Sequence, residues 1–273
     1  MRTPRDFSHS LKCLVFNSRT PNFIVDFPKY DFKIEKGKFS AKAPELKKAI
    51  VEHSWDRKIK DMDYMFHDQK AAKDNSEKIL YQVYRVGQAW GGALKKREKF
   101  GLEWDITILM NGKVGDEYFK TKGHFHNPLN GIPPAEAYQV LEGEGKLLMQ
   151  DQKNNVFICD VKEGETMFIE GNYAHGLMNT GGKPLVVVGC VPVEAGHAYG
   201  PIEDLGGFAR LVTEKGIIPN PNYKQSAQGA LKTGKLSKST PSLVPLYDKS
   251  PEELRKMLVE WKKYPGAYKK QFG

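Results

Sequence analysis

The segment Gly123-His124-Phe125-His126 is the most informative stretch of this chain of 273 residues. On an extended strand, residues i and i+2 point to the same face. His124 and His126 can therefore place two imidazoles together, while Phe125 faces the other way. Alone, such a pair is more often part of a surface or a core than of a binding site. Residues further along the chain therefore decide between these roles.

Two further residues complete the pattern. Glu136 opens the next predicted strand after a turn over residues 127–134, and an antiparallel return would bring it opposite the histidine pair. His175 arrives one hairpin later. Three imidazoles and one carboxylate suit a divalent transition metal, because these ligands are of borderline hardness. The predicted metal ligands are His124, His126, Glu136 and His175.

The segments around these residues predict a mainly β protein. Short runs rich in β-branched and aromatic residues are separated by turns such as Asn111-Gly112 and Gly143-Glu144-Gly145. Strands at this spacing are typical of a sandwich or barrel. The predicted strands cover residues 79–86, 105–110, 117–121, 137–141, 146–150, 156–159, 166–169, 176–179 and 184–191.

The ends of the chain have a different character. Residues 44–54 predict a helix, and residues 219–249 are rich in Pro, Lys, Ser, Gly and Thr, which favours an irregular surface segment. A last helix is predicted from Pro251, with Ser250 as its N-cap. Its apolar face comprises Leu254, Met257, Leu258 and Trp261. Packing of this face on the barrel is favoured over packing on a partner.

Composition narrows the classes of function. Hydrophobic residues make up 40% and charged residues 27%, as in ordinary globular proteins. The net charge of +9 is concentrated in C-terminal lysines and accompanies no nucleic-acid-binding motif, so a solvated tail is expected rather than nucleic-acid binding. No secretory signal or membrane-spanning run is visible, and a cytoplasmic protein is expected. Three widely spaced cysteines predict neither disulfides nor a thiolate site.

The spacings around the candidate ligands resemble those of the cupin superfamily. Glu136 is followed by six residues and then Gly143, and His175 by three residues and then Asn179. Two features depart from the usual motifs. Nine residues separate His126 from Glu136, and Glu170 replaces a proline before the last ligand.

A narrower resemblance covers residues 79–223. Specific runs look like the cupin-type glucose-6-phosphate isomerase family of archaea and some bacteria, namely residues 119–126, 135–138, 143–145, 174–179 and 195–200. This likeness implies a cupin (double-stranded β-helix or jelly-roll) barrel over residues 78–223. Residues 1–77 would form an N-terminal extension packing on it, and residues 224–273 a basic linker with the C-terminal amphipathic helix.

The resemblance also assigns roles to individual residues. Glu136 and His197 would be catalytic, with Glu136 also a metal ligand. Substrate would contact residues matching the family's phosphate-side and sugar-side groups, namely Tyr84, Thr107, Thr121, Gly123, Tyr138 and Tyr199. Lys120 and Lys122 could add charge, but strand alternation would point both away from the face of Thr121. Val191 and Ala198 replace a tyrosine and an aspartate of the family.

The function implied is a metal-dependent aldose–ketose isomerase that interconverts glucose 6-phosphate and fructose 6-phosphate in glycolysis and gluconeogenesis. One divalent metal per subunit is expected, with Fe²⁺ placed ahead of Mn²⁺, Zn²⁺, Ni²⁺ and Co²⁺, and a homodimer is expected. The alternatives are a cupin acting on another sugar phosphate such as mannose 6-phosphate, a cupin dioxygenase, and a sugar-binding cupin without activity.

Overall fold

The computed structural model describes the chain in several stretches. They cover residues 24–27, 32–35, 38–41, 55–85, 100–225, 229–235 and 251–263. The predicted helix over residues 44–54 and the predicted N-cap Ser250 lie outside these stretches.

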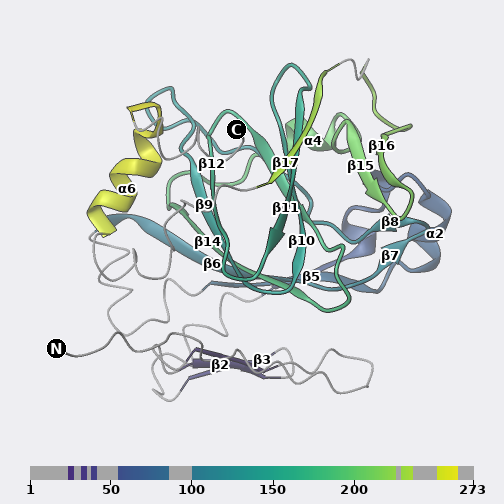
Figure 1. Cartoon of the computed structure of the whole chain (residues 1–273), viewed down its shortest axis with the longest axis horizontal. Helices are drawn as coiled ribbons and strands as arrows, with labels where there is room; N and C mark the ends of the chain where they lie inside the picture. The colour runs from purple at the N-terminus through teal and green to yellow at the C-terminus, as the bar shows by residue number, and fades with distance from the viewer. Residues whose placement is uncertain are drawn as a thin grey trace.

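A six-stranded antiparallel sheet forms one layer of the molecule (Figure 1). Its strands run in the spatial order β12-β9-β14-β6-β5-β4. In chain order they are β4 (Trp55–Lys58), β5 (Ile79–Arg85), β6 (Leu102–Leu109), β9 (Glu136–Glu142), β12 (Thr166–Ile169) and β14 (Leu185–Pro192).

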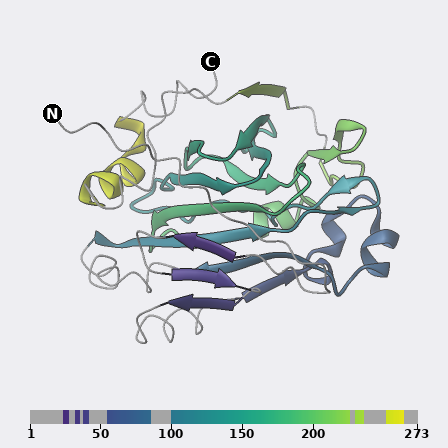
Figure 2. The same ribbon diagram turned by 60° about the horizontal axis from the view of Figure 1, so that its bottom comes forward.

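A four-stranded sheet forms the second layer, stacked on the first (Figures 1 and 2). Its spatial order is β13-β10-β11-β17. The strands are β10 (Glu144–Gln150), β11 (Val156–Lys162), β13 (Ala174–Met178) and β17 (Leu231–Lys235). The mainly β prediction is confirmed. Among the described residues, however, the two sheets are not hydrogen-bonded into a closed barrel.

The two layers enclose a core of aliphatic and aromatic side chains. All eight residues of β14, which lies between β6 and β9 in the middle of the larger sheet and packs against the C-terminal helix, are buried. Burial of side chains on both faces accounts for its continuous apolar sequence. The turn from β9 to β10 requires Gly143, whose φ is 86° and whose added Cβ would lie 2.5 Å from the carbonyl oxygen of Pro184.

Smaller elements surround these layers. A second four-stranded sheet contains β7 (Lys113–Val114), β8 (Glu117–Tyr118), β15 (Arg210–Thr213) and β16 (Gly216–Pro219). A three-stranded sheet contains β1 (Ile24–Phe27), β2 (Phe32–Glu35) and β3 (Lys38–Ala41). The helices are η1 (Ile59–Asp61), η2 (Asp63–Met65), α2 (Gln69–Asp74), α4 (Gly200–Glu203), α6 (Pro251–Val259) and η3 (Trp261–Lys263). Every helix in the described stretches is too short or too polar to span a bilayer.

Two strands lie outside residues 78–223 but pair with the main sheets. β4 lies before residue 78 but pairs with β5, so the six-stranded sheet begins inside the predicted N-terminal extension. β17 lies beyond residue 223 and pairs with β11 in parallel, within a segment predicted to be irregular. Both strands join the sheets through long-range pairing, which local composition does not reveal.

The C-terminal helix is as predicted. Leu254, Leu258 and Trp261 are buried and Met257 is partly buried against the core.

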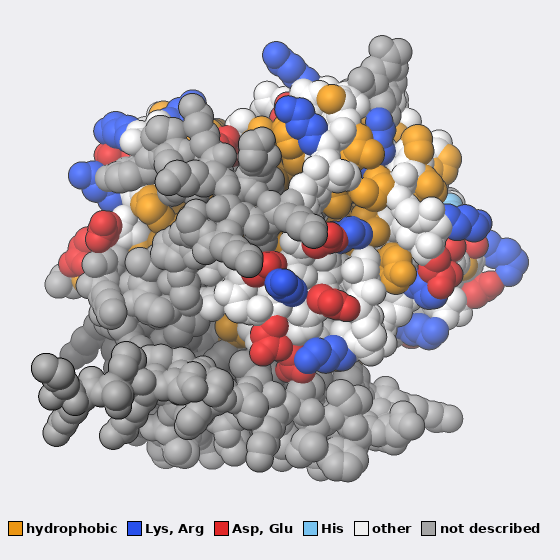
Figure 3. Space-filling view, viewed as in Figure 1, with side chains coloured by type: hydrophobic (Ala, Val, Ile, Leu, Met, Phe, Trp, Pro, Cys, Tyr) orange, Lys and Arg blue, Asp and Glu red, His pale blue; other side chains and the backbone are white. Residues whose placement is uncertain are grey.

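The face drawn in Figure 3 shows acidic and basic side chains interspersed over the described residues, rather than a patch of one sign.

Candidate active site

The four predicted metal ligands come from three parts of the fold. Glu136 is the first residue of β9, and His175 lies on β13. His124 and His126 lie on the connection that follows β8. This connection does not pair with β9 as predicted: the His124 N–H donates to the His175 carbonyl at 3.3 Å, and the His175 N–H donates to the His124 carbonyl at 3.1 Å.

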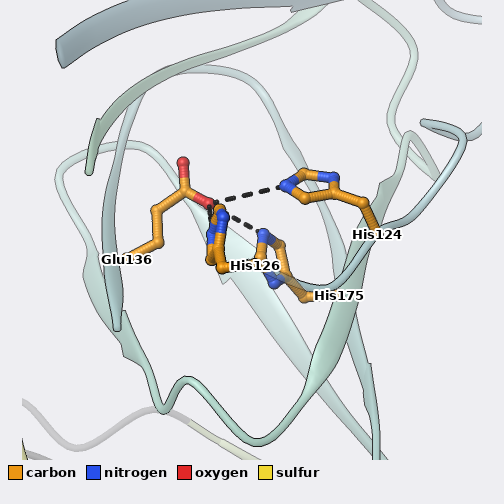
Figure 4. Close-up of side chains that lie close together, drawn as sticks. All are labelled: His124, His126, Glu136 and His175. Atoms are coloured by element: carbon orange, nitrogen blue, oxygen red, sulfur yellow. Dashed lines mark hydrogen bonds and ion pairs between the residues drawn. The ribbon is translucent and has the colours of Figure 1, made fainter. Parts of the chain in front are cut away.

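The side chains nevertheless converge (Figure 4). One carboxylate oxygen, Glu136 Oε2, lies 2.8 Å from His175 Nε2, 3.0 Å from His126 Nε2 and 4.0 Å from His124 Nε2. One ligand atom from each residue lies within 4.8 Å of all the others. The most exposed of the four side chains, that of His124, is only 12% accessible. This cluster of three imidazoles and a carboxylate could hold a metal ion.

The hydrogen bonding of the cluster fits a cation. His126 Nδ1 lies 2.8 Å from the carbonyl oxygen of Gly196. A carbonyl only accepts, so Nδ1 carries the proton in a neutral ring and Nε2 turns its lone pair toward the cluster. His124 Nε2 is buried and has no hydrogen-bond partner. A buried nitrogen without a partner is costly, and a metal ion would satisfy it.

Two pKa shifts favour the protonation states that a metal requires. Burial, together with the imidazoles of His175 and His126, lowers the pKa of His124 well below its ordinary value. Burial alone would raise the pKa of Glu136, but the neighbouring imidazoles of His126 and His175 outweigh burial and lower it. His124 is therefore neutral and Glu136 ionised at neutral pH.

A cavity of about 320 Å³ adjoins the cluster. It is large enough for a small-molecule substrate. His124 and Glu136 line it, together with most of the other predicted site residues, namely Thr107, Thr121, Gly123, Tyr138, His197 and Tyr199. The structure therefore brings together residues that are up to 92 positions apart, from Thr107 to Tyr199.

Tyr84 is the exception among the predicted residues. It is buried on β5 but does not line this cavity, whereas Tyr81 and Val83 do. The reason is the alternation of β5, on which Tyr81 and Tyr84 point to opposite faces. Tyr81 is the tyrosine of this strand that contacts the site.

Sequence reasoning missed several other residues of the cavity wall. They are Trp55, Arg57, Asp105, Lys122, Leu177 and Gly189. Lys122 was expected to point away, but residues 121–123 form no strand and Gly123 has a φ of 75°, so alternation does not hold there. Arg57 could be found only by knowing that β4 pairs with β5.

Arg57, Tyr81 and Lys122 form a hydrogen-bonded group at the cavity. Arg57 Nε donates to the Tyr81 hydroxyl at 3.3 Å, and the Lys122 N–H donates to the same oxygen at 3.4 Å. Burial raises the pKa of Tyr81, so its hydroxyl keeps its proton. Accepting two hydrogen bonds leaves that proton available for a ligand.

Tyr199 contacts both this group and the histidines. Its ring centroid lies 5.5 Å from that of His124, 5.3 Å from Lys122 Nζ and 5.9 Å from Arg57 Cζ. Lys122 also forms an ion pair with Glu203. Cationic groups and the histidine cluster thus share one cavity, with a tyrosine in contact with each.

A family model described as glucose-6-phosphate isomerase matches residues 56–228, which include every residue of this site except Trp55. The chain belongs to the glucose-6-phosphate isomerase family. It is therefore an isomerase, as the sequence motifs imply.

Named relatives within this family come from archaea and bacteria. Glucose-6-phosphate isomerase of Pyrococcus furiosus is 34% identical over 177 residues, covering 62% of this chain and 87% of that protein. The Thermococcus litoralis enzyme is 33% identical over 176 residues, covering 62% and 86%. Putative glucose-6-phosphate isomerase 1 of Rhizobium meliloti is 25% identical, covering 63% and 79%.

Among solved structures, oxalate oxidase in complex with the substrate analogue glycolate resembles part of the chain, with a TM-score of 0.35 and 18% identity, covering 46% of this chain and 58% of that one.

Proposed function

We propose that this protein is a metal-dependent isomerase that interconverts glucose 6-phosphate and fructose 6-phosphate. One observation carries the proposal: a cluster of three imidazoles and a carboxylate shares a cavity of about 320 Å³ with two cationic side chains and several hydroxyl donors. The names of the archaeal relatives support the choice of substrate. The reaction would serve glycolysis and gluconeogenesis.

The phosphate would bind among Arg57, Lys122 and the neutral donors beside them. Charge-assisted hydrogen bonds to a phosphate are stronger than neutral ones, so the two cations supply most of the attraction. Tyr81 donates its hydroxyl proton, and Thr107 and Thr121 line the same wall. The Gly123 amide lies on this wall because its positive φ turns the chain there.

Glu136 is the proton carrier in this mechanism. Its two oxygens have different surroundings, because Oε2 faces the histidines whereas Oε1 approaches Gly189. An added Cβ on Gly189 would lie 3.0 Å from Oε1. A carboxylate held in this way can keep Oε2 in the cluster while Oε1 moves a proton between C1 and C2 of the open-chain sugar.

The remaining groups orient the sugar. A divalent metal held by His124, His126, Glu136 and His175, with Fe²⁺ our first choice, would supply positive charge to stabilise the negative charge that develops on the sugar. The His197 ring stacks on the Tyr199 ring with centroids 5.8 Å apart, and in this proposal His197 would move a hydroxyl proton during ring opening. Tyr138, whose pKa is raised well above its ordinary value chiefly by burial, remains a hydroxyl donor.

Another sugar phosphate is the second candidate, because Val191 and Ala198 depart from the family pattern. Neither residue lines the described cavity. Val191 is buried in β14, and Ala198 is engaged by backbone hydrogen bonds with Phe125. Neither position therefore offers a direct contact through which these residues could select another sugar.

The test is an assay of aldose–ketose conversion with several hexose phosphates, after removal of metal by a chelator and after its return. We expect turnover that depends on metal and is fastest with glucose 6-phosphate and fructose 6-phosphate. No turnover of any sugar phosphate with metal restored would refute the proposal.

Substitution Glu136→Gln tests the proton carrier. We expect a loss of at least about 100-fold in kcat, the usual contribution of a general base. Glu163→Gln, an exposed glutamate outside the cavity, is the matched control. Solvent deuterium in the product would support proton transfer, whereas complete retention of substrate hydrogen would favour a hydride shift that needs no base.

We expect one metal per subunit, a homodimer and a cytoplasmic location. Sedimentation of the purified protein over a range of concentrations measures the oligomeric state.

A further inference from the structure

Helix α6 and the turn η3 lie at residues 251–263, beyond the stretch matched by the family model, which ends at residue 228. In Figure 1 the helix lies against one end of the six-stranded sheet, beside β9 and β14. Its apolar face is buried in the common core through Leu254, Leu258 and Trp261. Apolar burial alone would make α6 a cover for the sheet.

Polar contacts connect α6 to the segment that leads into Glu136. The Ala135 N–H donates to the Leu258 carbonyl oxygen at 2.8 Å. Trp261 Nε1 donates to the Pro133 carbonyl oxygen at 2.9 Å. The backbone is thus fixed from η3 at Pro133 and from α6 at Ala135, the residue immediately before the carboxylate of the cluster.

Arg255 connects the same helix to a second segment of the site. Its guanidinium donates to both oxygens of Glu194, at 2.8 and 3.1 Å, and to the Gly101 carbonyl oxygen at 2.6 Å. Such a two-bond contact fixes orientation as well as distance. Glu194 lies in the loop that follows β14 and continues to His197.

That loop holds the histidine pair in place. The Asn127 N–H donates to the Ala195 carbonyl oxygen at 2.7 Å, and His126 Nδ1 donates to the Gly196 carbonyl oxygen at 2.8 Å. The Gly196 carbonyl thereby sets the tautomer and the ring orientation of His126. One short helix therefore contacts both segments that orient the cluster, one next to Glu136 and one that holds His126.

We propose that α6 and η3 position the residues of the metal cluster, with Arg255 and Trp261 as the positioning residues. The inference rests on the proposed function, because it concerns the same cluster. Groups that orient metal ligands from outside the ligand set typically change metal affinity by about 10-fold or more when removed. A helix that only covered the sheet would have no such effect on a folded protein.

The experiment compares four full-length proteins after chelation: the unmodified chain, Arg255→Gln, Trp261→Phe and the control Lys256→Gln. Lys256 is exposed on the same helix. Each is titrated with Co²⁺, whose visible absorption reports both affinity and ligand geometry. Circular dichroism at the titration temperature checks that each protein is folded.

We expect Arg255→Gln and Trp261→Phe to weaken Co²⁺ binding by about 10-fold, to alter the absorption bands and to lower kcat more than they change KM. Lys256→Gln should match the unmodified protein. Equal Co²⁺ affinity and equal spectra in all four proteins would overturn the positioning role of α6 and η3 and leave the proposed function standing. No Co²⁺ binding by the unmodified protein would overturn both.

A second measurement needs no variant. Because coupling between sites is reciprocal, Co²⁺ binding should slow amide hydrogen exchange in residues 251–263 and at Ala135 of the unmodified protein. Unchanged exchange in both places at saturating Co²⁺ would also overturn the inference.

Discussion

Arg57 provides the most informative test of how the cavity recognises its substrate. If it binds the phosphate, replacing it with glutamine removes a fixed positive charge while keeping a shorter polar side chain. Burial disfavours its charge, but Tyr81, Tyr199 and Asp61 together outweigh burial and raise the pKa of Arg57, so it is a cation under all assay conditions. Its loss should therefore appear as weaker binding of phosphorylated ligands at every pH tested.

The magnitude can be worked from the surroundings of each cation. Two unit charges about 4.5 Å apart attract by about 4 kcal/mol at an effective dielectric constant of about 20. Desolvation offsets part of this, and hydrogen bonds to charged groups contribute about 1.5–3 kcal/mol net. A loss of about 2 kcal/mol corresponds to a KM about 30-fold higher for Arg57→Gln.

Lys122 should matter less. It already pairs with Glu203, and that ion pair must be shared or broken when phosphate binds. We expect Lys122→Gln to raise KM by about 3–10-fold, in line with a net contribution near 1 kcal/mol. Glu203→Gln should have the opposite effect and lower KM, because it releases Lys122 for the substrate.

The assay is steady-state isomerisation of the hexose phosphate at several salt concentrations, with inorganic phosphate as a competing ligand. Added salt should weaken phosphate binding by the unmodified protein more than by Arg57→Gln, because salt screens the attraction between Arg57 and phosphate, which the variant lacks. Lys113→Gln is the control, since Lys113 pairs with Glu214 away from the cavity. An unchanged KM and unchanged inhibition by phosphate in Arg57→Gln would refute the reasoning.

Two other predictions concern the cluster itself. Gly189→Ala should lower kcat more than it raises KM, because the new Cβ would lie 3.0 Å from Glu136 Oε1 and crowd it. Gly182→Ala is the control, since an added Cβ there meets no atom within 4 Å. Equal kcat values in the two variants would contradict this prediction. In the metal-free protein, the lowered pKa of His124 means that the unfolded chain binds more protons than the folded chain below the ordinary pKa of 6.5. The free energy of unfolding should be constant above that pH and fall by up to about 1.4 kcal/mol per pH unit below it, as measured by urea unfolding in chelator. A free energy that rose as the pH fell would contradict this sign.

Sequence spacing was enough to assemble the candidate metal centre. His124 and His126 share a face through local alternation, and Glu136 and His175 begin or occupy strands of predictable type. The pairing of the histidine connection was predicted wrongly, with Glu136 rather than His175. The side chains still converge, because the layers bring β9 and β13 to the same cluster.

The cationic part of the cavity could not be predicted in the same way. Alternation along β5 places Tyr81 and Tyr84 on opposite faces, but it does not say which face meets the cavity. That choice is made by the register of β5 against β6, in which Tyr81 lies opposite Leu109. Arg57 depends on one further step, the pairing of Trp55 with Val83 that adds β4 to the sheet.

The contacts of Tyr199 suggest why both halves of the site are needed. Its ring touches His124 and also lies beside Lys122 and Arg57, so the metal cluster and the cations are about one aromatic side chain apart. When the phosphate of a ligand is bound at Arg57 and Lys122, only carbons several bonds away from that phosphate can reach the metal cluster. Binding energy from the phosphate then restricts where C1 and C2 lie before any proton moves, which is how contacts remote from the reacting atoms can raise the rate. By this reasoning an unphosphorylated sugar should lose kcat as well as affinity, whereas a cavity that only gathered substrate would lose affinity alone.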